Sequence, residues 1–357
     1  MRLAYVINSL EAGGAQFPIP RIVAGLRERG VETTVYSLST RDGLSIPKLE
    51  AVGVPYRRAP FAKTAHLKAA RWLRAELRRD RPDALWTSLT QATLIGQRVG
   101  SELGLPVISW QHNAFLKRAN RFLLRRQVGM SRFWIADSES VADFTHASLG
   151  VSADNIAVLP LFVANPDAPQ AKPALEGPVR IVSVGRLHRN KNYDGLIEAL
   201  SRTELEHQWT LHIAGDGKQR ENLDILRQDW DHIDDVILHG HVTDIPAFLA
   251  SGDLYVQSSL NEGLCIAAHE AMAAGLPCVV TETGQMPLTL GDAGWTAEAT
   301  EQLGPLAIAI KAAFHDRTTW RDRGATARQR VLERFDQARF DAALDAIVAR
   351  LRDVVRM

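Results

Sequence analysis

The chain has 357 residues, about twice the usual length of one domain, so two domains are expected. Hydrophobic residues make up 46% and charged residues 23%, which is ordinary for a globular protein, and the formal net charge of +1 gives no general attraction to nucleic acid. Two cysteines are too few for a disulfide framework, the apolar part of the N-terminal stretch is too short for a signal peptide, and no run approaches the ~20 apolar residues of a membrane-spanning helix. We therefore expect a cytoplasmic protein without a nucleic-acid partner.

Short β-rich runs alternate with helical runs in the first half of the chain. Residues 3–8 predict a buried strand, which a loop with Gly13 and Gly14 joins to a helix that ends near Gly30. Further strands are predicted at 31–38, 84–87, 106–110 and 133–136. Such a βαβ series indicates a mainly parallel sheet covered by helices.

The same pattern starts again after a proline-rich stretch. Residues 163–178 contain four prolines and little apolar content, which is typical of a linker. We place the linker at 165–178, the first domain at 1–164 and the second at 179–335. Strands of the second domain are predicted at 179–184, 210–214, 236–238, 254–257 and 278–280. An amphipathic helix at about 336–357 is expected to pack back on the first domain.

The stretch 259–280 holds two carboxylates, Glu262 and Glu270, with seven residues between them. A helix is predicted from about 265 to 274, because Gly275 and Pro277 are typical of a helix end. Small residues at 267, 271 and 274 form a stripe that lets this helix lie close to a sheet. Glu270 is next to that stripe, and a buried carboxylate is costly unless hydroxyl or N–H donors reach it.

The start of this helix offers a second indication of the ligand. Its free backbone N–H groups and positive dipole end attract an anion such as a phosphate, and Gly263 allows a close approach. An anion site beside a carboxylate that binds hydroxyl groups suggests a sugar nucleotide.

These spaced residues resemble the carboxylate-pair signature of the retaining GT-B glycosyltransferases of family 4 (glycosyl transferases group 1): Glu262-Gly263-Leu264, Glu270-Ala271 and Gly275-Leu276-Pro277. Shorter pieces follow in the order of that family: Gly13-Gly14-Ala15, the His112 segment, 184–187 with Lys191, 214–217, and Gly240 before Val242. The resemblance covers nearly the whole chain. It implies an α/β fold of the GT-B type, with two Rossmann-like domains whose parallel sheets face each other across a cleft.

The resemblance also implies a role for single residues. Arg186 and Lys191 resemble the basic pair that grips the donor diphosphate, where two fixed cations would stabilise the leaving group without a metal. Glu262 resembles the residue that reads hydroxyls of the transferred sugar, and Glu270 the one that binds the ribose. His112 resembles the histidine that contacts the donor sugar from the first domain. The expected catalytic residues are thus Arg186, Lys191, Glu262 and His112.

Other donor contacts are expected through the backbone, and the resemblance implies them at Gly14, Gly185, Val242, Gly263, Leu264 and Cys265. Glycines let the backbone approach the diphosphate or the acceptor closely, and Val242 lies in the stretch 240–243 where the base is expected. No metal and no cofactor is expected.

Each assignment has a structural alternative. Glu270 is also compatible with a partly exposed carboxylate on a surface helix. Arg186 and Lys191 are also compatible with a solvated loop, and His112 with a hydrogen-bonded histidine that follows a strand. Gly13 and Gly14 also fit a plain turn. Cys265 at a helix N-terminus could be a nucleophile of lowered pKa, although the family has small residues there for access to the backbone.

Three places depart from the family pattern. Gln16, Phe17 and Pro18 follow the first-loop glycines where an acidic residue is common, so the first helix is expected to start late. Residues 159–163 replace an Asn-Gly pair, and 284–288 lack the usual second glycine and following glutamate. We expect these differences to affect the donor, the acceptor or domain closure, and not the main site.

Composition and motifs exclude two common nucleotide-binding classes, since the chain lacks the glycine fingerprint of dinucleotide oxidoreductases and the Gly-Lys-Ser/Thr of a P-loop. The predicted function is a retaining hexosyltransferase of class EC 2.4. It would move a sugar from a nucleoside diphosphate sugar, with uridine as the expected base, to a glycan or lipid-linked acceptor in cell-surface polysaccharide or glycolipid biosynthesis. A GT-B sugar-nucleotide epimerase and a non-catalytic sugar-nucleotide-binding subunit are the alternatives.

Two basic segments of the first domain, 63–81 and 117–126, mix arginines and lysines with apolar residues. Basic amphipathic helices dock on anionic membranes, so the segments suggest peripheral contact with the inner face of a membrane. Solvated faces of ordinary helices are the alternative.

Overall fold

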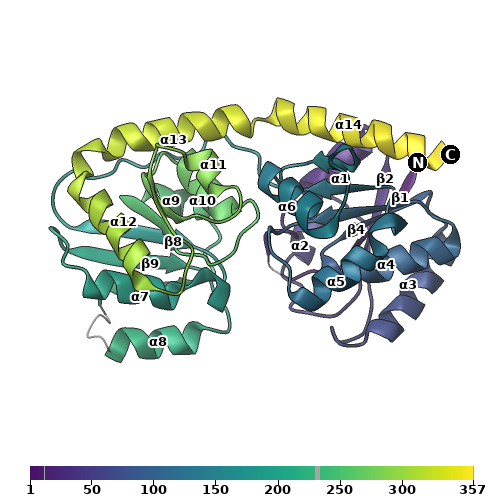
Figure 1. The fold of residues 1–357 in the computed structure, drawn as a ribbon, viewed down its shortest axis with the longest axis horizontal. Coiled ribbons are helices and arrows are strands. Elements are labelled where there is room, and N and C mark those ends of the chain that lie inside the picture. Colours follow the sequence, from purple (N-terminus) through teal and green to yellow (C-terminus); the bar gives the residue numbers. More distant parts are fainter. Residues whose placement is uncertain (12, 230–233, 357) are drawn as a thin grey trace. The chain divides into compact units, whose positions relative to one another are not determined.

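The computed structural model describes residues 1–11, 13–229 and 234–356, and the chain divides into two compact units. Unit 1 comprises Met1–Leu161 and Ala338–Met357, and unit 2 comprises Phe162–Gln337. Each unit has its own parallel sheet covered by helices (Figure 1). The predicted α/β fold with two Rossmann-like domains is therefore confirmed.

Unit 1 contains a seven-stranded sheet in the order β3-β2-β1-β4-β5-β6-β7, with parallel pairing throughout. The strands are β1 (Arg2–Ile7), β2 (Glu32–Ser37), β3 (Tyr56–Arg58), β4 (Ala84–Ser88), β5 (Val107–Gln111), β6 (Phe133–Ala136) and β7 (Ile156–Val158). The helices are α1 (Ile19–Glu28), α2 (Ile46–Ala51), α3 (His66–Asp80), α4 (Thr90–Leu103), α5 (Arg118–Gln127) and α6 (Glu139–Leu149). The strand order reverses between β1 and β4, which places loops for ligand binding at their carboxyl ends.

The central strands of this sheet are buried on both faces. All residues of β4, β5 and β6 are buried, as is typical of the central strands of a sheet that helices cover on both sides. Trp86 and Trp110 lie on neighbouring strands with their ring centroids 5.4 Å apart. These strands therefore form a rigid support for the loops that follow them.

The C-terminal helix α14 (Gln337–Arg356) packs on unit 1, next to α1 (Figure 1). Gly25 of α1 makes this possible, because a Cβ atom there would lie 2.6 Å from Cδ2 of Leu344. The Arg29 guanidinium adds ion pairs to Asp341 at 3.1 Å and to Asp345 at 2.7 Å. The two ends of the sequence thus meet in one unit.

Unit 2 contains a six-stranded parallel sheet in the order β10-β9-β8-β11-β12-β13. The strands are β8 (Val179–Val184), β9 (Trp209–Ala214), β10 (Val236–Gly240), β11 (Leu254–Gln257), β12 (Cys278–Thr281) and β13 (Trp295–Ala297). The helices are α7 (Tyr193–Arg202), α8 (Arg220–Asp229), α9 (Ile245–Ala250), α10 (Ile266–Ala273), α11 (Met286–Leu290), α12 (Leu303–His315) and α13 (Trp320–Arg334). The order reverses between β8 and β11, which is the switch point of this sheet.

The segment 165–178, predicted as a linker between domains, belongs to unit 2. The buried guanidinium of Arg317 donates hydrogen bonds to the carbonyls of Ala174, Gly177 and Glu176 at 3.1, 2.7 and 2.9 Å. Proline content indicated a segment without regular structure, but these bonds tie its backbone to the 3₁₀ turn Arg317–Thr319 of unit 2. The chain passes between the units directly after Leu161 and again after Gln337.

Candidate functional site

The loop after β8 carries the predicted basic pair and is shaped by the loop after β9. The N–H of Gly185 donates to the carbonyl of Ala214, and that of Leu187 to Asp216, both at 2.9 Å. Gly215 has a φ of +148°, and a Cβ atom there would lie 1.9 Å from the carbonyl oxygen of Gly185. Only glycine allows this contact between the two loops. Arg186 lies exposed in the loop that the contact shapes.

Lys191 and Glu262 form an ion pair across the switch point of unit 2. Lys191 Nζ lies 2.8 Å from Glu262 Oε1, and the two side chains are 18% and 14% exposed. Lys191 ends the 3₁₀ turn Arg189–Lys191 after β8, and Glu262 follows β11. Burial lowers the pKa of the Lys191 ammonium, but the carboxylate of Glu262 raises it more, so that it lies above its ordinary value. The ammonium is therefore charged.

Backbone hydrogen bonds fasten the same two loops to each other. The N–H of Leu260 donates to the carbonyl of Asn190 at 2.8 Å, and the hydroxyl of Ser258 donates to the carbonyl of Lys191 at 2.8 Å. The side-chain amide of Asn190 donates to the carbonyl of Asn261. These bonds hold the ion pair in one position.

The stretch after Glu262 enters α10 through a left-handed residue. Cys265 is the N-cap of α10 with a φ of +61°, and Gly263, Leu264 and Cys265 are buried. The structure places α10 at Ile266–Ala273, within one residue at each end of the predicted 265–274. Burial raises the pKa of the Cys265 thiol to about 12, and Glu262 adds to the effect. A neutral, buried thiol is a poor nucleophile, which favours a backbone role at this position.

Gly284, in a loop that departs from the family pattern, supports this stretch. It has a φ of +53°, and a Cβ atom there would lie 2.0 Å from the carbonyl oxygen of Gly263. The next residue, Gln285, donates its N–H to that same oxygen at 2.8 Å. The loop 283–285 therefore fixes the backbone that follows Glu262.

Glu270 lies on the second turn of α10. We expected it to be buried, but the structure leaves it half-buried. Ala271 and Ala274 are buried, whereas Ala267 is half-buried, so the stripe faces the interior only in part. The cost of full burial therefore does not apply to this carboxylate. Val242, after β10, is also half-buried.

The candidate site residues of unit 1 lie in loops that follow its parallel strands. His112 comes directly after β5 and is 7% exposed. Gly13 and Gly14 lie in the loop after β1, where the carbonyl of Gly13 accepts from the N–H groups of Gln16 and Phe17 at 3.1 Å each. As predicted, α1 starts late, at Ile19, after Pro18.

Both ring nitrogens of His112 are already hydrogen-bonded inside unit 1. Nε2 lies 2.7 Å from Ser88 Oγ, and Nδ1 lies 2.9 and 3.2 Å from the two carboxylate oxygens of Asp137. Burial raises the pKa of Asp137, while the neighbouring His112 opposes that rise. Neither Ser88 nor Asp137 belongs to a motif of the sequence, although each, like His112, stands at the carboxyl end of a buried strand.

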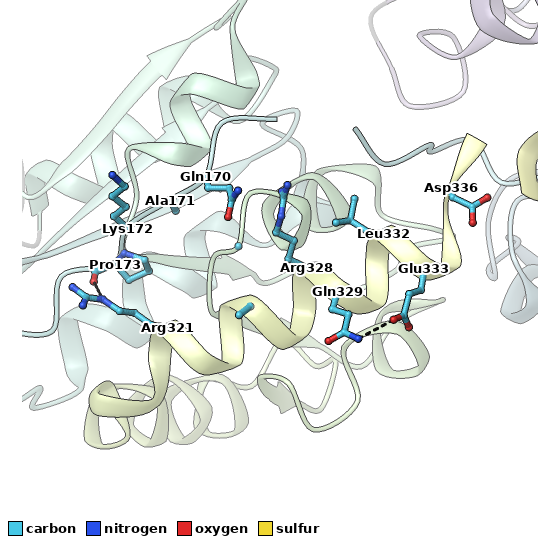
Figure 2. A pocket seen from close by; sticks show the side chains of 12 residues that line it. Gln170, Ala171, Lys172, Pro173, Arg321, Arg328, Gln329, Leu332, Glu333 and Asp336 are labelled. Atoms are coloured by element: carbon cyan, nitrogen blue, oxygen red, sulfur yellow. Dashed lines mark hydrogen bonds between the residues drawn. The ribbon is translucent and has the colours of Figure 1, made fainter. Parts of the chain in front are cut away.

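A separate hollow of about 860 Å³ lies in unit 2 between the segment 170–173 and α13, as Figure 2 shows. Arg321 donates there to the carbonyl of Pro173 at 3.2 Å, and Gln329 donates to Glu333 at 2.9 Å. The side chain of Arg328 donates to the carbonyls of Ala273 and Pro166. These polar groups bond to the chain itself, and none of the predicted site residues lines the hollow.

Within the residues that the structure describes, no three His, Cys, Asp or Glu side chains are grouped so that they could hold a metal ion. In the same residues no helix is long and apolar enough to span a membrane.

Comparison with known proteins adds independent information. The model of the family described as Glycosyltransferase Family 4 matches residues 12–164, and that of Glycosyl transferases group 1 matches residues 165–330. Two similar proteins are the lipopolysaccharide core biosynthesis glycosyltransferases LpsD and LpsE of Rhizobium meliloti (strain 1021). LpsD is 30% identical over 151 residues, which are 42% of this chain and 38% of LpsD. LpsE is 31% identical over 182 residues, which are 48% of each chain. The chain thus spans less than half of the length of these relatives.

Solved structures match over nearly the whole chain. Anabaena Alr3699/HepE in complex with UDP-glucose has a TM-score of 0.82 at 19% identity and covers 98% of this chain and 99% of its own. The lipopolysaccharide outer core galactosyltransferase WaaB, in its apo form, has a TM-score of 0.74 at 17% identity and covers 98% and 100%. Identities this low show a common fold and no more. Together with the two family models, that common fold shows that this chain belongs to the GT-B glycosyltransferases of family 4.

Proposed function

We propose that this protein transfers a hexosyl group from a nucleoside diphosphate sugar to a glycan or lipid-linked acceptor, with retention of the anomeric configuration. One observation carries the proposal: the ion pair of Lys191 and Glu262 lies at the switch point of the second sheet, where ligands of open α/β sheets bind. A fixed cation beside a carboxylate suits a ligand that joins a diphosphate to a sugar.

Lys191 and Arg186 would bind the diphosphate. The leaving nucleoside diphosphate gains negative charge as the glycosidic bond breaks, and fixed cations stabilise that charge most in the transition state. The Lys191 ammonium is 2.8 Å from Glu262. A diphosphate would compete for this ammonium and release the Glu262 carboxylate to accept hydrogen bonds from hydroxyls of the transferred sugar.

The remaining donor contacts are proposed at loops that follow the strands. The backbone after Glu262 would meet the phosphates or the sugar, and Gly185 and Gly14 would allow close approach. Glu270 would accept hydrogen bonds from the ribose hydroxyls, and the backbone at Val242 would contact the base. His112 would contact the transferred sugar. With two cations on the leaving group, the reaction would need neither a metal nor a cofactor.

The comparisons support the choice of donor and acceptor. Alr3699/HepE was solved with UDP and with UDP-glucose, which supports uridine as the base. LpsD and LpsE are named for lipopolysaccharide core biosynthesis, which supports an acceptor of cell-surface glycan or glycolipid biosynthesis.

The test is incubation of the whole protein with radiolabelled UDP-glucose and UDP-galactose and with a lipopolysaccharide-core or polyprenyl-linked acceptor. Label in the acceptor with retained configuration supports the proposal, whereas an epimerised donor or a donor that is only bound supports one of the two alternatives. Lys191→Met and Arg186→Ala should each lower kcat/KM by about 100-fold. Lys172→Met is the matched control, because this lysine lies exposed in the hollow of Figure 2. Wild-type turnover in the double variant Arg186→Ala, Lys191→Ala would overturn the assignment.

We also propose that unit 1 contacts the cytoplasmic face of an anionic membrane through α5 and its flanks. Residues 112–132 contain no Asp or Glu, and exposed basic side chains accompany exposed apolar ones, with Phe115, Phe122 and Met130 at 49%, 56% and 41% exposure. The basic residues are Lys117, Arg118, Arg121, Arg125, Arg126 and Arg132. Arginines with aromatic side chains are typical of helices that lie in a membrane surface.

The structure favours α5 over α3, the other basic segment. On α3, Arg74 pairs with Glu102 and Arg79 with Glu76, so part of its charge is neutralised. On α5, only Leu124 and Gln127 are buried, and the exposed arginines are spaced three and four residues apart around Phe122. Both requirements of a membrane contact, positive charge and apolar area, are therefore exposed on one helix.

Flotation with vesicles of phosphatidylcholine and phosphatidylglycerol tests this surface. Phe122→Ser should lower the bound fraction several-fold, because a buried aromatic ring contributes about 2 kcal/mol. Leu67→Ser is the matched control, since Leu67 is 78% exposed on the competing helix α3. Equal binding of both variants, or no binding of the wild type at low salt, would refute the role of α5.

A further inference from the structure

Ser88, His112 and Asp137 form a chain of hydrogen bonds along three neighbouring strands of unit 1. Ser88 ends β4, His112 follows β5 and Asp137 follows β6, and the sheet order places these strands side by side. The Ser88 hydroxyl is 2.7 Å from Nε2, and the carboxylate is 2.9 Å from Nδ1 at its nearer oxygen. The three side chains are 0%, 7% and 1% exposed.

The contacts suit one proton position on the ring. An ionised Asp137 carboxylate would accept a hydrogen bond from Nδ1–H. Nε2 would then carry a lone pair that accepts a hydrogen bond from the Ser88 hydroxyl. The indole of Trp110 lies against the imidazole, with centroids 4.8 Å apart and an interplanar angle of 32°. The ring is thus held at both nitrogens and on one face.

The arrangement has the members of a Ser-His-Asp triad, but the burial of Ser88 argues against a nucleophile. A side chain with no exposed surface cannot reach a substrate carbonyl. The residue after it, Leu89, has a φ of +73° and a ψ of 152°, a conformation that costs energy for a residue with a side chain. Such strain persists where the surroundings hold a residue firmly. The strained Leu89 directly follows Ser88, whose hydroxyl contacts His112.

We propose that Asp137 and Ser88 are positioning residues for His112. Asp137 fixes the tautomer with a proton on Nδ1, and Ser88 donates a hydrogen bond to the Nε2 lone pair, so that the two side chains hold the imidazole in one orientation for its contact with the transferred sugar. This proposal rests on the function proposed above, because it needs a sugar-nucleotide donor that contacts His112. It adds Ser88 at the end of β4 and Asp137 directly after β6 to the sugar contact that was proposed for His112 alone.

A comparison of UDP and UDP-glucose as ligands isolates the sugar contact. Asp137→Ala should weaken UDP-glucose binding and raise its KM by roughly five- to tenfold, the effect of one hydrogen bond, and should leave UDP binding unchanged because UDP has no sugar at this position. Asp137→Asn should recover most of the lost UDP-glucose affinity, since its amide oxygen can still accept a hydrogen bond from Nδ1–H. Equal weakening of UDP and UDP-glucose would overturn the proposal.

A double-mutant cycle shows whether Asp137 acts through His112. In a His112→Ala background, Asp137→Ala and Ser88→Ala should have no further effect on UDP-glucose binding, whereas additive losses would indicate a merely structural role and overturn the proposal. Labelling of Ser88 by a fluorophosphonate would also overturn it, because it would show an accessible nucleophile.

The tautomer is measured without any sugar nucleotide. Nitrogen-15 shifts of His112, assigned by their loss in His112→Gln, should show a protonated Nδ1 and a bare Nε2. The reverse tautomer would refute the role of Asp137. This measurement separates failure of the positioning proposal from failure of the proposed function, which the transfer assay decides.

Discussion

The pair of Lys191 and Glu262 illustrates what single residues reveal. The motifs that predict a diphosphate contact for the lysine and a sugar contact for the glutamate place the two residues 71 positions apart in the chain. The structure brings the two side chains to 2.8 Å from each other. Since each is mostly buried, removing one would leave an unpaired charge, which costs several kcal/mol. The activity of variants at this pair should therefore be interpreted together with a measurement of their folding stability.

His269 belongs to none of the predicted site residues, and it makes the stability of unit 2 depend on pH. Its side chain is fully buried, with Nδ1 2.9 Å from the carbonyl of Cys265 and Nε2 3.1 Å from Thr289 Oγ1. The ring lies against Phe162 and Phe335, the aromatic residues closest to the points where the chain passes between the units. A neutral ring suits these contacts.

Burial lowers the pKa of His269 to about 4, while an unfolded histidine has a pKa of ~6.5. Between these values the unfolded chain binds a proton that the folded chain does not bind, so stability is complete above pH 6.5 and falls as the pH drops toward 4. We expect a loss of about 3 kcal/mol over this range. His269→Gln should remove this part of the pH dependence, measured as the difference in urea unfolding between pH 4.5 and pH 7.5. Parallel profiles of the two proteins would contradict the prediction.

At the scale of elements, the site of unit 2 depends on loops that support other loops. Gly215, Gly217 and Gly284 each have a positive φ and lie where a Cβ atom would meet the backbone of a neighbouring loop. The loop with Arg186 and Lys191 therefore takes its shape from the loop after β9, and the loop with Glu262 takes part of its shape from residues 283–285. The short glycine motifs are structural supports of the charged residues.

Gly215→Ala tests this dependence. The added methyl group would lie 1.9 Å from the carbonyl oxygen of Gly185, so the loop that carries Lys191 must move. We expect UDP affinity to fall by at least tenfold and the free energy of unfolding to fall by about 1–3 kcal/mol. Gly150→Ala is the control, because Gly150 also has a positive φ but has no atom within 4 Å of the position that the methyl group would take. Calorimetric titration with UDP measures the affinity, and an unchanged value in Gly215→Ala would contradict the prediction.

Elements themselves were predictable where their sequence pattern was long. The predicted strands at 3–8, 106–110 and 254–257 correspond to β1, β5 and β11, and the predicted helix at 265–274 to α10. Three strands were missed: β3, β7 and β13. Each has three residues and lies at an edge of its sheet, where periodicity gives no signal and pairing with one neighbour defines the strand.

At the scale of the whole molecule, each half builds its own doubly wound sheet, and α14 closes unit 1 with residues from the far end of the sequence. The repeated pattern of strand, glycine loop and helix was enough to predict two Rossmann-like domains. It did not show that the segment 165–178 belongs to unit 2, because the hydrogen bonds of Arg317 come from a residue about 140 positions away. Contacts over such separations leave no local pattern.

The sequence by itself determined the fold class, the family and the residues with charges or free backbone groups at the ends of strands, because these follow from local patterns of polarity and turn residues. Only the tertiary structure decided which of them meet. It paired Lys191 with Glu262, left Glu270 half-buried, and joined His112 to Ser88 and Asp137, two residues that no motif marked. The reason is the parallel sheet: strands that are distant in the sequence become neighbours, and the side chains at their carboxyl ends then share one edge.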